Sequence, residues 1–164
     1  RRGITLMIDT TGVQIKRNRK YEGVVDKLCG RKNPYTGKPL FNYNKDLMVF
    51  AAMVGYTHGV KEELEPEGIQ IVLHTYATDE KDGFIYLIAL LEKQEAICLK
   101  DDNIVDSVKY FELYCNGGLS IIKQWLDDNP GDADALDTLM DKAFERITID
   151  KGILSSRDLP KPVW

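Results

Sequence analysis

The clearest helical pattern of the chain is IVDSVKYFELYCNGGLSIIKQWL, residues 104–126. Its first half repeats apolar residues every three or four positions, as one face of a helix requires: Ile104, Val108, Phe111 and Cys115. Asn116-Gly117-Gly118 then predicts a helix end, because Asn and Gly readily adopt the left-handed conformation that follows a helix C-terminus. A second apolar face follows at Leu119, Ile122, Trp125 and Leu126. We therefore expect two short helices joined at the glycine pair.

Similar amphipathic patterns extend from this stretch in both directions. Downstream, Asp132 or Asp134 is expected to cap a helix that runs from Leu136 to Ile147. Upstream, helices are predicted at residues 21–28, from the N-cap Asn44 to Gly55 or Gly59, and through residues 84–93. Residues 30–44 combine glycine, proline and asparagine and are expected to form a loop.

These segments predict a mainly α protein, a compact single-domain bundle of about six helices with at most a short extended or β segment near residues 69–75. We expect a basic N-terminal arm at residues 1–20, a helical domain at 21–150 and a C-terminal tail at 151–164. Because the chain does not begin with methionine, residues 1–6 are expected to be a cloning remnant that precedes a natural start at Met7.

Charge is distributed unevenly along the 164 residues. The formal net charge is −4, yet residues 1–61 hold 12 of the 22 Lys and Arg and 4 of the 26 Asp and Glu, which is a charge of +8. The remaining residues carry −12. No apolar run approaches the roughly 18 residues of a membrane span, and the three cysteines, Cys29, Cys98 and Cys115, are widely spaced. We expect a cytoplasmic protein with reduced thiols and no membrane contact.

Motifs for catalysis are not found in the sequence. His58 and His74 are the two histidines, and none of the five His and Cys residues is spaced as zinc ligands are. No glycine-rich phosphate loop occurs. We therefore expect no catalytic residues, no metal and no cofactor. The acidic groups around residues 79–82, 101–106 and 127–134 leave a Mg²⁺-dependent nuclease as a less favoured alternative.

Two basic elements are the candidate nucleic-acid contacts. The first is the run KRNRK, with Lys16, Arg17, Arg19 and Lys20. The second is the loop that carries Arg31, Lys32, Tyr35 and Lys38. Cations that alternate with aromatic rings suit a phosphate backbone, because the charges release counterions and the rings can stack on exposed bases. The alternative is that the basic residues dock on acidic ones, within the chain or on another subunit.

Three segments together resemble a known family. They are KDLMVFAAMVGYTHG at Lys45–Gly59, the apolar helix near Ile88, and YCNGGLSIIKQWL at Tyr114–Leu126. The chain resembles, over residues 20–127, the small fourth family of proteins associated with the bacterial Dnd (DNA phosphorothioation) gene clusters. The matching positions are helical core positions and include no catalytic motif.

This resemblance implies a biological setting, in which sulfur replaces a non-bridging phosphate oxygen of DNA and companion restriction proteins attack unmodified DNA. It implies a non-catalytic accessory protein of a phage-defence system that contacts DNA, the larger restriction subunits, or both. A protein-interaction or oligomerisation module without DNA contact, including a homo-oligomer, is the alternative. Of the two basic elements, the 31–43 loop lies inside the family-like region, whereas the run KRNRK lies outside it.

Overall fold

The computed structural model describes residues 12–78, 80–96 and 103–155, with side chains through Arg146. The predicted fold class is confirmed: within these residues the protein is mainly helical, with six α-helices and one small antiparallel sheet. The elements in chain order are β1 (Gln14–Arg17), η1 (Arg19–Tyr21), α1 (Glu22–Val25), η2 (Asp26–Gly30), α2 (Asn44–His58), β2 (Ile69–Val72), α3 (His74–Ala77), α4 (Asp82–Lys93), α5 (Ile104–Asp128) and α6 (Leu136–Ser155).

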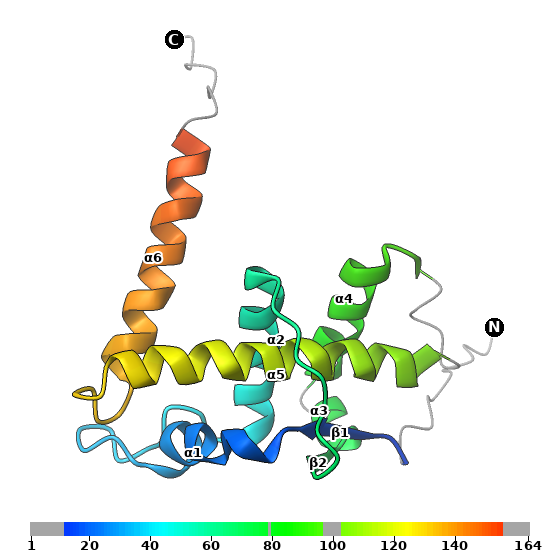
Figure 1. Ribbon diagram of the computed structural model, residues 1–164, viewed down its shortest axis with the longest axis horizontal. Coiled ribbons are helices and arrows are strands. Elements are labelled where there is room, and N and C mark those ends of the chain that lie inside the picture. The colour runs from blue at the N-terminus through cyan, green and yellow to red at the C-terminus, as the bar shows by residue number, and fades with distance from the viewer. Residues whose placement is uncertain (1–11, 79, 97–102, 156–164) are drawn as a thin grey trace, which may run out of the picture.

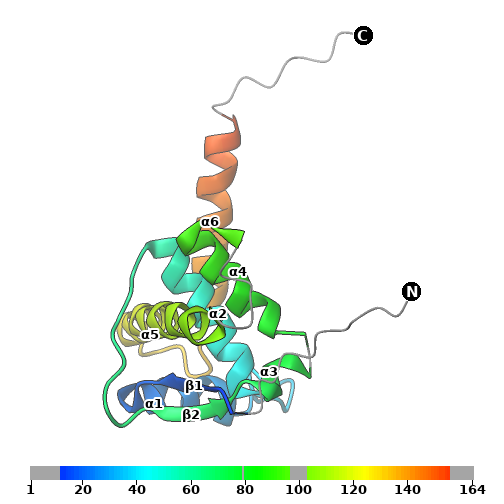
Figure 2. The same cartoon turned by 90° about the vertical axis from the view of Figure 1, so that its right-hand side faces the viewer.

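Helix α5 is the spine of the molecule. It runs along the longest axis, and α2 crosses it near its middle (Figure 1). The sheet and α1 lie on one side of α5 and α4 lies on the other (Figure 2). Completely buried apolar side chains of α2, α4 and α5 fill the space between them, among them Leu47, Ile88 and Phe111. Burial of these side chains is the main source of stability.

The predicted break at Asn116-Gly117-Gly118 is wrong, because α5 continues through it as one helix of 25 residues. The glycines allow the backbones of α2 and α5 to approach each other. A Cβ added to Gly118 would overlap the carbonyl oxygen of Ala51, and one added to Gly55 would overlap the carbonyl oxygen of Tyr114. A helix interior tolerates glycine at a cost of about 1 kcal/mol relative to alanine. Here close packing of the two helices compensates for it.

Gly59 is the glycine that does end a helix. Its φ of +66° is left-handed, and Val60 N donates a hydrogen bond to Gly55 O at 2.9 Å. This is the arrangement expected after a helix C-terminus. The prediction that the helix ends at Gly55 or Gly59 is therefore confirmed for Gly59. The N-cap is Tyr43 rather than Asn44, which is the first residue of α2.

The basic N-terminal segment is part of the fold from Gln14 onward. β1 pairs antiparallel with β2, with Gln14 opposite Val72 and Arg17 opposite Ile69. Ile15 is completely buried in the core. Residues 14–20 therefore do not form a separate arm as the sequence suggested, and residues 1–11 lie outside the described structure. The extended segment predicted near residues 69–75 is β2, followed at once by α3.

Helix α6 leaves the body of the molecule at its N-terminal turns and extends away from it (Figures 1 and 2). It continues to Ser155, so the helix extends five residues into the predicted tail at 151–164. Leu139 is buried against the core, whereas Leu136, Met140 and Phe144 are exposed on the same helix. None of the described helices is long and apolar enough to cross a membrane.

Candidate nucleic-acid interface

The run KRNRK is held in place by a buried polar network. Asn18 is completely buried, and its backbone N–H donates to Asn116 Oδ1 at 2.8 Å. Its side-chain nitrogen donates to Glu62 Oε1 and to Glu63 O, both at 2.9 Å, while its Oδ1 accepts from Glu65 N at 2.7 Å. Asn18 thus joins β1, α5 and the segment 62–65 through side-chain and backbone bonds.

Arg17 does not lie on the surface as a DNA contact would. Its side chain is 1% exposed, and its Nη2 donates to Glu22 Oε2 at 2.9 Å. Its Nε and Nη1 have no hydrogen-bond partner among the described residues. A buried guanidinium cannot reach a phosphate, so this member of the basic run is corrected to a core residue. Lys16 is half-buried, and its backbone N–H donates to Glu112 Oε1 at 2.7 Å.

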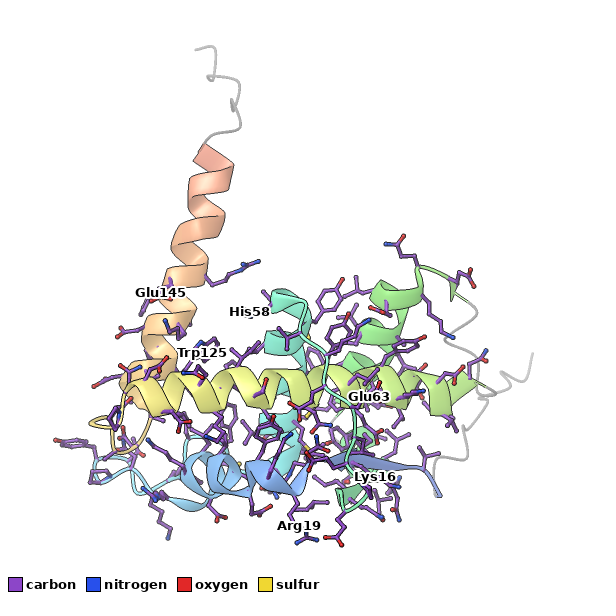
Figure 3. The ribbon with its side chains drawn as sticks, in the orientation of Figure 1. Lys16, Arg19, His58, Glu63, Trp125 and Glu145 are labelled. Atoms are coloured by element: carbon purple, nitrogen blue, oxygen red, sulfur yellow. The ribbon has the colours of Figure 1, made fainter. Side chains whose placement is uncertain are left out.

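Lys20 is engaged by two carboxylates. Its Nζ lies 2.7 Å from Glu62 Oε1 and 2.8 Å from Glu65 Oε1, and these bonds raise the pKa of Lys20. Tyr21 Oη donates to the second oxygen of Glu62 at 2.5 Å. Arg19 alone in this run is exposed with no ion pair in the described chain, and it points away from the body (Figure 3). Most cations of the run KRNRK therefore stabilise the fold and are not available to bind a ligand.

Glu62 is the acceptor at the centre of this network. Partial burial alone would raise the pKa of its carboxyl, but hydrogen bonds from Lys20, Tyr21 and Asn18 together outweigh burial and lower it. Glu112 shows the opposite balance, since burial raises its pKa more than the Lys16 amide and charge lower it. Two glutamates on neighbouring segments therefore respond to acid in opposite ways.

We expect Glu62 to make the fold sensitive to acid. Its folded pKa is lowered, so its contribution is present above the ordinary glutamate value of about 4.5 and is lost as the pH falls through the folded pKa. Urea unfolding of wild type and Glu62→Gln between about pH 7 and pH 3 measures this. The difference in unfolding free energy between them should shrink on acidification.

Glu112→Gln is the matched control for this pH series, because it makes the same chemical change at a carboxyl whose pKa is raised. The folded state gains relative stability as that carboxyl takes up its proton. The wild-type advantage over Glu112→Gln should therefore grow, not shrink, as the pH falls toward 4.5. Parallel pH profiles for the two variants would contradict this assignment.

The second basic element is a closed loop at residues 31–38, which we call the basic loop. Asn33 N donates to Lys38 O at 2.9 Å, and Gly37 N donates to Asn33 O at 2.8 Å. Asn33 Oδ1 accepts from Tyr35 N at 2.8 Å and from Thr36 N at 3.1 Å. The left-handed Gly37, with φ +67°, completes the turn.

The basic loop is also anchored to the body. Asn33 Nδ2 donates to Asp134 Oδ2 just before α6, and Phe41 N donates to Leu28 O at 3.0 Å just after the loop. The ring of Phe41 packs against Phe50 of α2, with centroids 5.4 Å apart. The contact with Asp134 spans 101 positions of sequence, and no local pattern in the sequence predicts it.

The side chains predicted as contacts in this loop all point to solvent. Arg31, Lys32 and Lys38 are exposed, and none forms an ion pair within the part of the chain that is described. Tyr35 is 94% exposed. The structure thus places four predicted residues together on one short loop, while it separates them from Lys16, Arg17, Arg19 and Lys20.

The acidic residues at 127–134, which could suggest a nuclease, have structural partners. Asp132 Oδ2 accepts from Thr138 N at 2.7 Å and Asp134 Oδ1 accepts from Leu136 N at 3.3 Å, so both hold the start of α6. Asp127 pairs with Lys123 at 2.5 Å. Among the described residues no cluster of His, Cys, Asp and Glu could hold a metal ion. Residues 79 and 101–102 lie outside these residues.

Two grooves lie among the described residues, and Lys16 of the run KRNRK lines the first of them. One of about 550 Å³ lies between β1, the segment around Glu63 and the N-terminal half of α5. The other, of about 460 Å³, lies between α2, α5 and α6 and is bordered by His58, Trp125 and Glu145 (Figure 3). His58 Nδ1 is 2.9 Å from Val54 O, and its ring meets Trp125 edge to face. The imidazole of His58 is therefore held by the backbone of α2 and by the ring of Trp125.

Comparison with known families now adds the biological setting. The family model for DNA sulphur modification system-associated protein 4 matches residues 14–155. The chain belongs to this family. The match extends the resemblance seen in the sequence, because it includes β1 and all of α6. No curated protein and no solved structure matches the chain.

The family-like residues of α5 are explained by packing. Asn116 binds the backbone of Asn18, Gly117 lies against the carbonyl of Val60, and Gly118 lies against α2. Sequence reasoning missed Asn18, Asn116 and Glu62 as members of one network. The available signal was an asparagine in line with the apolar face of a helix, because a buried amide needs specific partners.

Proposed function

We propose that this protein is a non-catalytic accessory protein of a DNA sulphur modification system and that it contacts DNA through the basic loop. The observation that supports DNA contact is the gathering of Arg31, Lys32 and Lys38, exposed and without ion pairs in the described chain, on a loop fixed by its own backbone. Phosphates attract such cations, and each phosphate neutralised releases counterions from DNA.

A non-catalytic role is supported by the surroundings of two thiols, Cys29 and Cys115, and of the carboxylates at residues 127–134. Burial raises the pKa of the Cys29 thiol to about 11 and raises that of Cys115 as well, which makes both thiols poor nucleophiles near neutral pH. The carboxylates of residues 127–134 accept hydrogen bonds from a lysine, from the Gln124 side-chain amide or from N–H groups of α6. The family association then favours an accessory that works beside larger subunits.

Salt dependence of DNA binding tests this proposal. Fluorescence anisotropy with a duplex should show affinity that falls with salt, with a log–log slope near −0.9 for each phosphate neutralised. Arg31→Ala/Lys32→Ala should weaken binding and make that slope shallower by about 2. The reason is that two phosphate contacts are removed, while both side chains are exposed and the fold keeps its stability.

Arg19→Ala/Lys109→Ala is the matched control, since it also removes one Arg and one Lys that are exposed, form no ion pair in the described chain and lie outside the basic loop. This control should keep the wild-type slope. Equal loss in both double variants would indicate a general charge effect and contradict contact through the loop. Absence of binding at about 50 mM salt would remove DNA contact altogether.

One observation favours the second candidate function, a protein-interaction module without DNA contact. The apolar side chains of Leu136, Met140 and Phe144 are exposed on α6, the helix that extends away from the body of the molecule (Figure 1). Exposed apolar stripes often mark protein contacts. An accessory protein can use both surfaces, and the salt titration decides whether the basic loop adds DNA contact to it.

A further inference from the structure

We infer that the basic loop recognises nucleic acid with unpaired bases, and that Tyr35 is the ring on which such a base stacks. This inference rests on the proposed DNA contact and specifies its substrate class. It is carried by the combination of an exposed aromatic ring, a loop backbone closed by its own hydrogen bonds, and exposed cations on the same loop that form no ion pair in the described chain.

The Tyr35 side chain does not pack against the described part of the chain. The side chain is 94% exposed, so it adds almost nothing to the core. By contrast, Phe41 after the loop packs against Phe50, and Tyr56 of α2 meets Tyr114 edge to face with centroids 5.3 Å apart. Tyr35 offers both faces of its ring to a ligand.

The backbone below Tyr35 is set before any ligand arrives. Pro34 precedes it and has a fixed φ, while Asn33 Oδ1 binds the N–H groups of Tyr35 and Thr36. The bond from Asn33 N to Lys38 O closes the loop. A ring presented from an ordered backbone loses little conformational freedom on binding, and preorganisation of this kind favours affinity.

The cations lie at the base of the same loop. Because Asn33 and Lys38 are joined by a backbone bond, the chain segments that enter and leave the loop are neighbours, which brings the positions of Lys32 and Lys38 together below Tyr35. A strand that lays its phosphates along these cations can place a base on the ring. Proteins that bind single strands combine charge and aromatic stacking in this way.

The bases of a paired duplex cannot stack on the Tyr35 ring as those of a single strand can. Its bases are stacked on each other and show only their edges in the grooves. Stacking on Tyr35 therefore requires a base that is already unstacked, as in a single strand, a gap or a loop. The phosphate contacts of Arg31 and Lys32 serve both forms, so duplex binding remains but is weaker than binding to a single strand of equal charge.

The test compares three labelled probes by fluorescence anisotropy at fixed salt: an oligothymidine of about 20 nucleotides, a strand of equal length with no bases, and a duplex. Tyr35→Ala should weaken binding of the oligothymidine about tenfold, because one base loses its stacking partner. It should leave the base-free strand and the duplex nearly unchanged. Tyr35→Phe should behave as wild type, since it keeps the ring.

Lys38→Ala is the control for charge, and it should lower the affinity for all three probes by similar factors. If Tyr35→Ala leaves oligothymidine binding unchanged, or weakens binding of all three probes equally, the inference that a base stacks on Tyr35 is wrong. The proposed DNA contact is not affected by that outcome. If wild type binds none of the probes at about 50 mM salt, both the DNA contact and this inference are wrong. Unchanged urea midpoints for Tyr35→Ala confirm that folding is not involved, as its exposure requires.

Discussion

Replacement of Gly118 by alanine is expected to destabilise the protein by about 3 kcal/mol or more. The new Cβ would overlap Ala51 O, with Gly55 N only 3.0 Å away. Both atoms belong to helix backbone, so relief requires α2 and α5 to move apart. That movement would loosen the largest packed interface of the core. Equilibrium urea unfolding measures the loss, or insoluble expression reports it.

Two glycine variants make this prediction specific. Gly23→Ala adds a Cβ to a helical glycine with nothing within 4 Å, so it should be neutral or slightly stabilising. Gly117→Ala adds one against Val60, which follows α2 in an irregular segment that can shift more easily than a helix. The loss should therefore be smaller than at Gly118. A Gly118→Ala protein as stable as Gly23→Ala would show that the helices are not in close contact.

Replacement of Asn18 by alanine is expected to cost about 2–4 kcal/mol. Three side-chain hydrogen bonds are lost, to Glu62, to Glu63 O and from Glu65 N. The carbonyl of Glu63 and the N–H of Glu65 then lose their partner beside a completely buried position, and an unpaired buried polar group costs more than its bond contributed. Urea unfolding at neutral pH measures the loss.

Asn42→Ala, which changes an exposed asparagine, is the control and should change stability by less than about 0.5 kcal/mol. Asn18→Asp is the sharper variant. It keeps an acceptor for Glu65 N but replaces the donor with an oxygen that faces the carboxylate of Glu62. It should therefore destabilise as much as alanine at pH 7. A fully stable Asn18→Asp would contradict the assigned hydrogen bonds.

The glycine pair shows why sequence reasoning failed at one point. Asn-Gly-Gly is a good local signal for a helix end, and the apolar residues on both sides fit two short helices as well as one long one. What decides between them is α2, which is distant in sequence and needs a groove on α5 at that place. Tertiary packing outweighs local propensity here, as it often does.

The two basic elements show the same limit at the candidate site. By composition the run KRNRK and the basic loop are equivalent. The fold buries Arg17 beside Glu22. It also pairs Lys20 with Glu62 and Glu65, so part of the positive charge of residues 1–61 is neutralised by carboxylates of the acidic remainder of the same chain. In the basic loop Arg31, Lys32 and Lys38 are all exposed and form no ion pair in the described chain, whereas in the run KRNRK this holds for Arg19 alone.

The helical class, most helix positions, the short extended segment and the family resemblance follow from the sequence, since these depend on periodicity and residue type along a local stretch. Tertiary structure alone decided that α5 is continuous, that β1 belongs to the core, and which cations are free. Those properties depend on contacts between residues far apart in the chain, such as Asn18 with Asn116 and Asn33 with Asp134. No local pattern encodes such contacts.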